Sequence, residues 1–117
     1  MKLKTLLCGV CLSLAMATTA FAAEPIKIGV YLPLKGQNAV GGQLELEGVQ
    51  LAHKERPSVL GRDVTLVVVD NKSDKVEAAN AVKRLTAMDK VTGIIGTYGS
   101  SLALSGGEVA EKAKTPV

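Results

Sequence analysis

Asp63-Val-Thr-Leu-Val-Val-Val-Asp70 is a continuous β-branched and aliphatic run with an aspartate at each end. Runs of this kind are typical of strands that are buried on both faces of a parallel sheet. Two further runs have the same character: Ile26-Lys-Ile-Gly-Val-Tyr-Leu32, which Pro33 ends, and the shorter Val91-Thr-Gly-Ile-Ile95. The sequence therefore predicts strands at 26–32, 63–70 and 91–95.

Amphipathic segments separate and follow these strands. Their apolar or small residues recur at intervals of three and four, which places them on one helical face. Asp74 followed by Glu77 also predicts a capping box, in which each side chain bonds a free amide of the first turn. The predicted helices and their inward residues are Gly42–Lys54 (Leu44, Gly48, Leu51, Ala52), Asp74–Met88 (Ala78, Ala81, Val82, Leu85) and Ser101–Lys114 (Leu102, Gly106, Val109, Ala110, Ala113).

The start of the last helix has two interpretations. Ser105 with Glu108 forms a second capping-box pattern, which would begin the helix later. The Gly106-Gly107 pair favours that later start, because each glycine inside a helix costs about 1 kcal/mol relative to alanine. Alternatively, Gly106 is small because the helix lies close against the sheet.

The alternation of strands and helices predicts an α/β fold: a three-layer αβα arrangement around a parallel sheet with right-handed crossovers. The common strand order would place 26–32 between 63–70 and 91–95. Thr115-Pro116-Val117 stands where a fourth strand would begin. Because three strands leave an unprotected sheet edge, we expect the sequence to be a truncated part of a larger domain.

Residues 1–22 have the layout of a cleaved secretory signal: Lys2 and Lys4, then an apolar run, then Ala20-Phe-Ala22. A membrane anchor is the alternative, but the run is shorter than the roughly 20 apolar residues that a span needs. The mature chain, 23–117, would then lie in the periplasm. Both cysteines fall within the signal, so the mature chain has no cysteine for a disulfide or a metal site.

The charge of the mature chain is nearly balanced. Removing two lysines from 14 basic residues leaves 12 against 11 acidic ones, a net charge of +1 with His53 neutral. No basic stretch suggests a nucleic-acid partner. The sequence also indicates no metal, no cofactor and no nucleophile–base–acid set, so we expect a binding protein rather than an enzyme.

Ligands of open α/β sheets lie at the carboxyl ends of the strands, where the strand order reverses. Two loops are expected there, Pro33–Gly42 and Gly96–Ser101. A helix amino terminus with free amides and a serine hydroxyl suits a carboxylate or a phosphate. The alternative is that Ser100 or Ser101 caps its own helix. Neither Gly-x-Gly-x-x-Gly nor Gly-x-x-x-x-Gly-Lys-Ser/Thr occurs, so a dinucleotide or triphosphate site is not expected.

Two other polar residues receive structural interpretations. His53 is the only histidine and stands near a predicted helix end, where a solvated or capping role is expected. Asp70 ends a strand and precedes the turn formers Asn71, Ser73 and Asp74, which predicts a loop cap rather than a phospho-acceptor.

The mature chain resembles the start of type 1 periplasmic binding proteins of the branched-chain amino-acid group. No single piece is diagnostic, but the order and spacing of the pieces are specific. The matching pieces are Ile26-Lys-Ile-Gly-Val30, Pro33-Leu-Lys-Gly36 with Ala39 and Gly42, Gly48-Val-Gln-Leu-Ala52, Asp70-Asn-Lys-Ser-Asp74, the helix to Leu85, Ile94-Ile-Gly96, Gly99-Ser-Ser101 and Val109-Ala with Pro116-Val117.

The resemblance implies two α/β lobes that close on a ligand, with 23–117 as the amino-terminal part of the first lobe. It places Ser100 at the ligand α-carboxylate, with Gly99 and Ser101 beside it. The segment from Gln37 to Gly41 would line the cleft opening, and Tyr98 either covers the ligand or packs locally.

The implied function is that of the amino-acid-binding component of an ABC importer, which delivers its ligand to a membrane permease. A sensor lobe of the same fold is one alternative. A flavodoxin-like enzyme or receiver domain is another, and it would require a cytosolic, unprocessed product.

Overall fold

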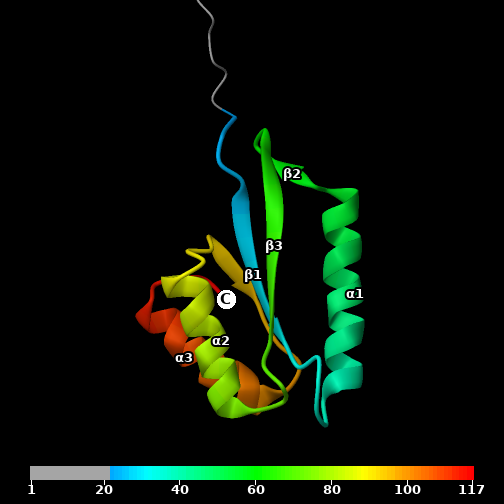
Figure 1. Cartoon of the computed structure of the whole chain (residues 1–117), viewed down its shortest axis with the longest axis vertical. Helices are drawn as coiled ribbons and strands as arrows, with labels where there is room; N and C mark the ends of the chain where they lie inside the picture. The colour runs from blue at the N-terminus through cyan, green and yellow to red at the C-terminus, as the bar shows by residue number, and fades with distance from the viewer. Residues whose placement is uncertain (1–21) are drawn as a thin grey trace, which may run out of the picture.

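The computed structural model describes residues 22–117, so nearly all of the predicted signal at 1–22 lies outside the described residues. The three predicted strands and three predicted helices are all present (Figure 1). The elements are β1 (Ile26–Leu32), α1 (Ala39–Glu55), β2 (Ser58–Val59), β3 (Arg62–Asp70), α2 (Lys75–Ala87), β4 (Gly93–Ile95) and α3 (Ser100–Lys112).

The sheet has the strand order β2-β3-β1-β4, which confirms the predicted central position of 26–32. Strand β1 is parallel to β3, from Ile26 opposite Val64 to Leu32 opposite Asp70. It is also parallel to β4. The carboxyl ends of β1 and β3 therefore lie side by side at one edge of the sheet.

One strand departs from the prediction of a wholly parallel sheet. The two-residue strand β2 pairs antiparallel with the start of β3. The turn between them, Leu60-Gly61, has φ values of 53° and 73°. Positive φ at both central residues matches the twist of a two-residue hairpin. Two residues are too few to show any periodicity, which is why the sequence did not indicate this strand.

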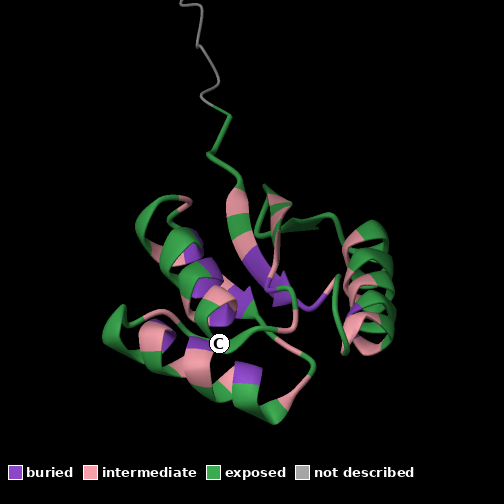
Figure 2. Cartoon of the chain, turned by 60° about the horizontal axis from the view of Figure 1, so that its bottom comes forward, coloured by how far each residue is buried: buried purple, intermediate pink, exposed green. Residues whose placement is uncertain are grey.

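The helices form the outer layers of the predicted three-layer arrangement. Helices α2 and α3 lie together on one side of the strands and α1 lies on the other (Figure 1). Buried residues concentrate on β1, α2 and α3, whereas α1 is mostly exposed or intermediate (Figure 2). Strand β3 has only exposed and intermediate residues, so the expectation that 63–70 is buried on both faces is wrong. The main core therefore lies between the sheet and the α2–α3 pair, around Tyr31, Val82, Leu85 and Leu102.

The predicted inward face of α1 is wrong for its two leucines, whereas the predicted Gly48 and Ala52 do line the hollow between this helix and the sheet. Leu44 and Leu51 are 63% and 59% exposed. The buried or half-buried residues of the helix include Gly42, Leu46, Val49 and His53. The helix carries apolar residues on both stripes, so periodicity could not select between them. The orientation of α1 about its own axis follows from the close approach of Gly42 to the Pro33 carbonyl, where no side chain fits.

The amino terminus of α2 forms half of the predicted capping box. Asp74 Oδ1 accepts a hydrogen bond from the Glu77 amide at 2.9 Å. The reciprocal bond is absent because the Asp74 amide donates to the Asn71 carbonyl instead, and the Glu77 carboxylate faces Lys72 at 3.5 Å. The cap therefore satisfies one amide of the first turn.

Helix α3 begins at Ser100, so the interpretation of a later start is wrong. The Ser105 hydroxyl lies inside the helix and donates to the Ser101 carbonyl at 3.0 Å. The close-packing interpretation of Gly106 is confirmed, because a Cβ at this position would lie 2.6 Å from the Tyr31 ring. The glycine thus lets the helix lie against the aromatic side chain.

Alanine at Gly106 and at Gly107 is expected to have opposite effects on stability. Gly106→Ala should lower the free energy of unfolding by about 1–2 kcal/mol, because the buried ring of Tyr31 must shift. Gly107→Ala should raise it by up to about 1 kcal/mol, since alanine favours the helix and no heavy atom lies within 4 Å of the new methyl group. Urea unfolding of both variants measures the difference, and equal changes would contradict the close packing.

The last residues continue beside β4. The Ile94 amide donates to the Pro116 carbonyl at 2.9 Å, at the edge where a fourth strand was predicted to begin. Residues 115–117 are not themselves in a strand. Among residues 22–117, no helix combines the length and the apolar character that a membrane crossing requires.

Candidate functional site

Three loops meet where the parallel strands end. Residues 33–38 follow β1, residues 71–74 follow β3, and residues 96–99 follow β4. Each loop leads into the amino terminus of a helix. Because carboxyl ends of parallel strands share one edge, this edge collects free helix amides and short polar side chains. Two of these loops were the ones predicted to carry the ligand.

The structure brings most of the predicted site residues together. Tyr98 packs across the first turn of α1, where a Cβ on Gly41 would lie 2.7 Å from its ring. A Cβ on Gly99 would lie 3.4 Å from the Asn38 side-chain nitrogen. Gln37 precedes Asn38 in the first loop and is exposed. Glycine at position 41 therefore makes room for the aromatic ring that the third loop supplies.

Ser100 and Ser101 occupy the first turn of α3 and are both exposed. The N-cap residue is Gly99, with φ of 110°, and no side chain caps the helix. The interpretation that a serine caps its own helix is therefore wrong in this structure. Within the described part of the chain, no protein acceptor bonds the backbone amides of Ser100 and Ser101. The amides and the hydroxyls are thus available to an anionic group.

The Tyr31 side chain packs against the loop before α3 and against the helix itself, at Gly96 and Gly106. This side chain is 1% exposed. The backbone of Gly96 lies so close to the ring that any Cβ there would overlap it. Burial removes the phenol from water and raises the pKa of Tyr31 above its ordinary value, so the ring stays neutral. The third loop therefore packs on a buried, uncharged ring.

Sequence reasoning missed two residues of this region. Asn71 is completely buried, and its side-chain nitrogen donates to the Thr97 hydroxyl at 2.8 Å. Asn71 was interpreted only as a turn former and Thr97 received no role. A usable signal was the position of each polar residue within two residues of a strand end, where loops of different strands meet.

Asp70 acts as the loop cap that the sequence predicted. Its Oδ1 accepts from the Lys72 amide at 2.8 Å and from the Leu34 amide at 2.9 Å. The second bond reaches across to the first loop, which the sequence did not indicate.

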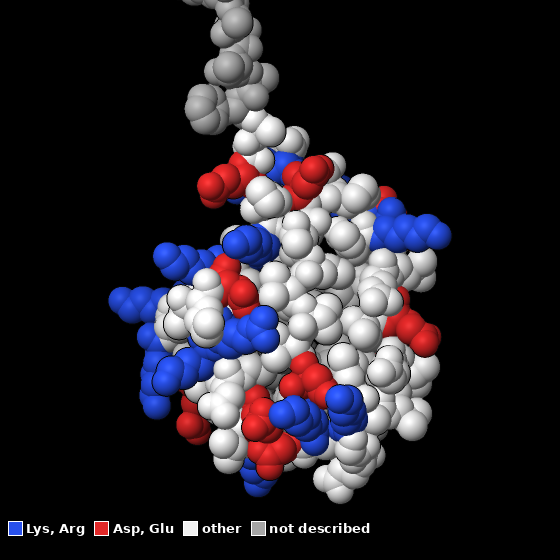
Figure 3. Space-filling model, viewed as in Figure 1, with Lys and Arg blue, Asp and Glu red and all other residues white. Residues whose placement is uncertain are grey.

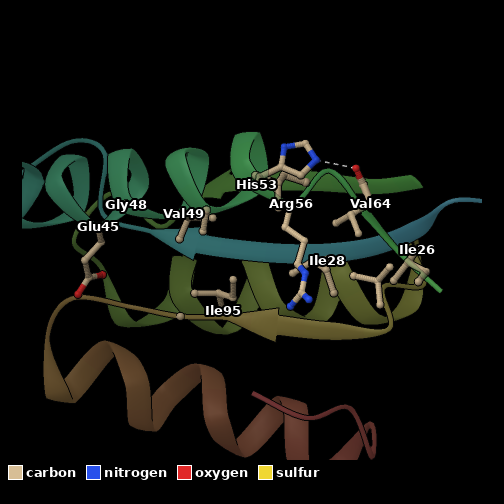
Figure 4. Close-up of a pocket in the computed structure, with 13 residues that line it drawn as sticks. Ile26, Ile28, Glu45, Gly48, Val49, His53, Arg56, Val64 and Ile95 are labelled. Carbon is tan, nitrogen blue, oxygen red and sulfur yellow. Dashed lines mark hydrogen bonds between the residues drawn. The ribbon is translucent and has the colours of Figure 1, made fainter. Parts of the chain in front are cut away.

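A separate apolar hollow lies between α1 and the sheet, away from the loop edge (Figure 4). It measures about 710 Å³ and is lined mainly by aliphatic side chains such as Ile28, Val49 and Leu66. His53 is half-buried at its wall and bonds the Val64 carbonyl at 2.7 Å, so the predicted solvated or capping role is wrong. None of the predicted site residues lines this hollow. Its apolar lining suits packing against other apolar groups rather than a charged solute.

Charged side chains do not favour one sign on the face seen in Figure 3. Lys and Arg are interspersed with Asp and Glu around an uncharged area in the middle of this face (Figure 3). This face therefore carries no extended field of one sign.

Comparison with known proteins gives consistent matches. A family model described as periplasmic binding protein matches residues 25–117. The Leu/Ile/Val-binding protein homolog 8 of Brucella suis is 32% identical over 120 residues. That alignment covers 99% of this chain but 30% of the relative, so the chain spans about a third of that protein's length.

Two solved structures share the fold. The leucine binding protein LivK from Thermotoga maritima superposes with a TM-score of 0.76 and 44% identity, over 78% of this chain and 26% of that one. The branched-chain amino acid transporter substrate binding protein LivJ from Streptococcus pneumoniae, in complex with isoleucine, gives a TM-score of 0.75 and 32% identity. It covers 79% of this chain and 27% of LivJ.

Proposed function

We propose a role in amino-acid capture for this chain, which belongs to the type 1 periplasmic binding proteins of the branched-chain amino-acid group. In this proposal the chain contributes part of the first of two lobes and takes no part in catalysis. The ligand is a branched-chain or related amino acid, as the names of its relatives suggest.

The observation that carries the proposal is the open amino terminus of α3. Ser100 and Ser101 present hydroxyls and unpaired amides at the loop edge, and Gly99 leaves the helix end without a side-chain cap. A carboxylate placed there would accept charge-assisted hydrogen bonds and meet the positive end of the helix dipole. Ser100 is the proposed partner of the ligand α-carboxylate, and Ser101 lies next to it.

The neighbouring residues would shape the space around that carboxylate. Tyr98 is 47% exposed, so part of its ring is free to contact a ligand. Gly41 lies against the Cγ end of the same ring. Gln37 is exposed in the first loop, at the proposed opening of the cleft. We propose that these three residues and Gly99 line the site.

The proposal extends to the location and the partner of the protein. Export through a signal at 1–22 would place the chain in the periplasm, where a closed, loaded protein would dock to the membrane permease of an ABC importer. A sensor lobe is the second candidate within the same family. A transmembrane segment elsewhere in the gene product would favour the sensor.

Calorimetric titration of the complete gene product tests the proposal. We expect one-site, saturable binding of leucine, isoleucine or valine. Isobutylamine, which is valine without its carboxyl group, should not bind measurably, because the α3 terminus would have no anion to hold. Failure of every amino acid to bind would contradict the proposed function. Equal binding of isobutylamine would remove the carboxylate from the mechanism.

A further inference from the structure

The turn that follows β3, residues 71–74, is bonded to both ligand-facing loops although it is expected to touch no ligand. We propose that this turn is a positioning element of the binding site, and that Asn71 acts on the ligand through Thr97. The inference rests on the proposed function, because it concerns the same site. It adds a positioning role for three residues, Asn71, Ser73 and Thr97, that are not among the proposed ligand contacts.

Asn71 connects the turn to the third loop. Its side chain is completely buried. The amide nitrogen donates to the Thr97 hydroxyl at 2.8 Å, and the amide oxygen accepts from the Ser73 amide at 3.1 Å. Its backbone amide also donates to the Leu32 carbonyl at 3.0 Å. Thr97 precedes Ser100, the first residue of α3, by three residues. In our proposal the bond from Asn71 to Thr97 therefore fixes the position of the amino terminus of α3.

Ser73 connects the same turn to the first loop. Its hydroxyl donates to the Lys35 carbonyl at 2.7 Å and accepts from the Asn38 amide at 3.1 Å. Lys72 and Ser73 both have positive φ, at 54° and 60°. Backbone in this region is strained for residues other than glycine and persists where surrounding contacts over-determine it. The conformation of this turn is therefore held by specific hydrogen bonds to its neighbours.

In the described part of the chain, no hydrogen bond runs directly from one ligand-facing loop to the other, and the Asp70 side chain beside the turn adds one more bond to the first loop, from the Leu34 amide. Residues 33–42 and 96–101 meet only through packing, at Gly41 with Tyr98 and at Asn38 with Gly99. Packing alone allows small sliding motions, whereas directed hydrogen bonds restrict position and angle. The affinity for a ligand that contacts both loops would therefore depend on the turn, because the turn fixes the position of one loop relative to the other.

Thr97→Val in the complete gene product tests the inference, because valine keeps the shape and removes the hydroxyl. At a temperature where the variant is fully folded, leucine should bind about tenfold more weakly, the effect of one buried hydrogen bond. Thr97→Ser, which restores a hydroxyl, should recover most of the affinity. Thr86→Val is the matched control: it removes a hydroxyl that bonds only the Val82 and Lys83 carbonyls within α2. Its affinity for leucine should be that of the wild type.

A double-variant cycle separates positioning from stability. If Thr97 acts through the α3 terminus, Thr97→Val should weaken binding much less when Ser100→Ala is already present. A lowered melting temperature with unchanged affinity, as for the Thr86 control, would overturn the inference, and so would full additivity with Ser100→Ala.

Ser73→Gly provides a second route if Thr97→Val does not fold. Glycine accepts the positive φ at this position without strain, so the variant removes the hydroxyl bonds to the first loop alone. It should also weaken leucine binding, and an unchanged affinity would overturn the inference. A wild-type protein that binds no amino acid would instead remove the proposed function and this inference with it.

Discussion

Gly42→Ala should lower the free energy of unfolding by about 3 kcal/mol, at the upper end of the usual cost of overpacking. A Cβ at this position would overlap the backbone carbonyl of Pro33. A backbone atom cannot rotate away as a side chain can, so either the first loop or the start of α1 has to move. The favourable helix propensity of alanine, about 1 kcal/mol, recovers only part of this cost.

Gly48→Ala is the control on the same helix. No heavy atom lies within 4 Å of a Cβ built at Gly48. This variant should therefore be more stable than the wild type by up to about 1 kcal/mol, from helix propensity alone. Urea unfolding followed by circular dichroism compares the two variants. A Gly42→Ala protein as stable as the wild type would show that α1 is not seated on Pro33 as described.

Ser100→Ala should weaken amino-acid binding by about 2 kcal/mol, roughly 30-fold, the usual cost of losing a buried bond to a charged group. The hydroxyl makes no cap in the unliganded chain. Its removal therefore leaves the helix start intact and affects the bound state. The melting temperature without ligand should stay close to that of the wild type, and calorimetry should show the loss in affinity.

Ser101→Ala is the matched control for this prediction. Ser101 is exposed in the same helical turn, and the bond that Ser105 makes to it uses the backbone carbonyl, which alanine retains. A smaller loss of affinity is expected, because Ser100 is the proposed direct partner. If Ser100→Ala binds leucine as the wild type does, Ser100 does not belong to the site. If only Ser101→Ala loses affinity, the two roles are exchanged.

The strands β1, β3 and β4 and all three helices could be predicted because their signals are local. The valine run at 67–69 and the apolar run at 26–32 both favour strands that pair within a sheet. Asp74 starts α2 by accepting a hydrogen bond from the amide of Glu77. The loops after β1 and β4 follow from the same alternation. The position of Ser100 at a helix terminus was therefore within reach of the sequence alone.

Local signals failed where two patterns competed. Helix α1 carries an apolar stripe through Leu44 and Leu51 and another through Leu46 and Val49, and only contact with the sheet selects the second. The Ser105 pattern resembled a cap as closely as Ser100 did. Helix α3 nevertheless begins at Ser100, five residues before Ser105, and Gly106 is explained by its packing against Tyr31.

The amino-acid sequence by itself determined the α/β alternation, the order of elements and the loop that carries Ser100, because propensity, capping and periodicity act between residues close in the chain. The tertiary structure alone decided which face of α1 turns inward, that Gly41 receives the Tyr98 ring, and that Asn71 reaches Thr97. Those contacts join residues 26 and 57 positions apart in the chain. Such pairs leave no periodic trace in a single sequence, since they exist only once the parallel strands bring their ends to one edge.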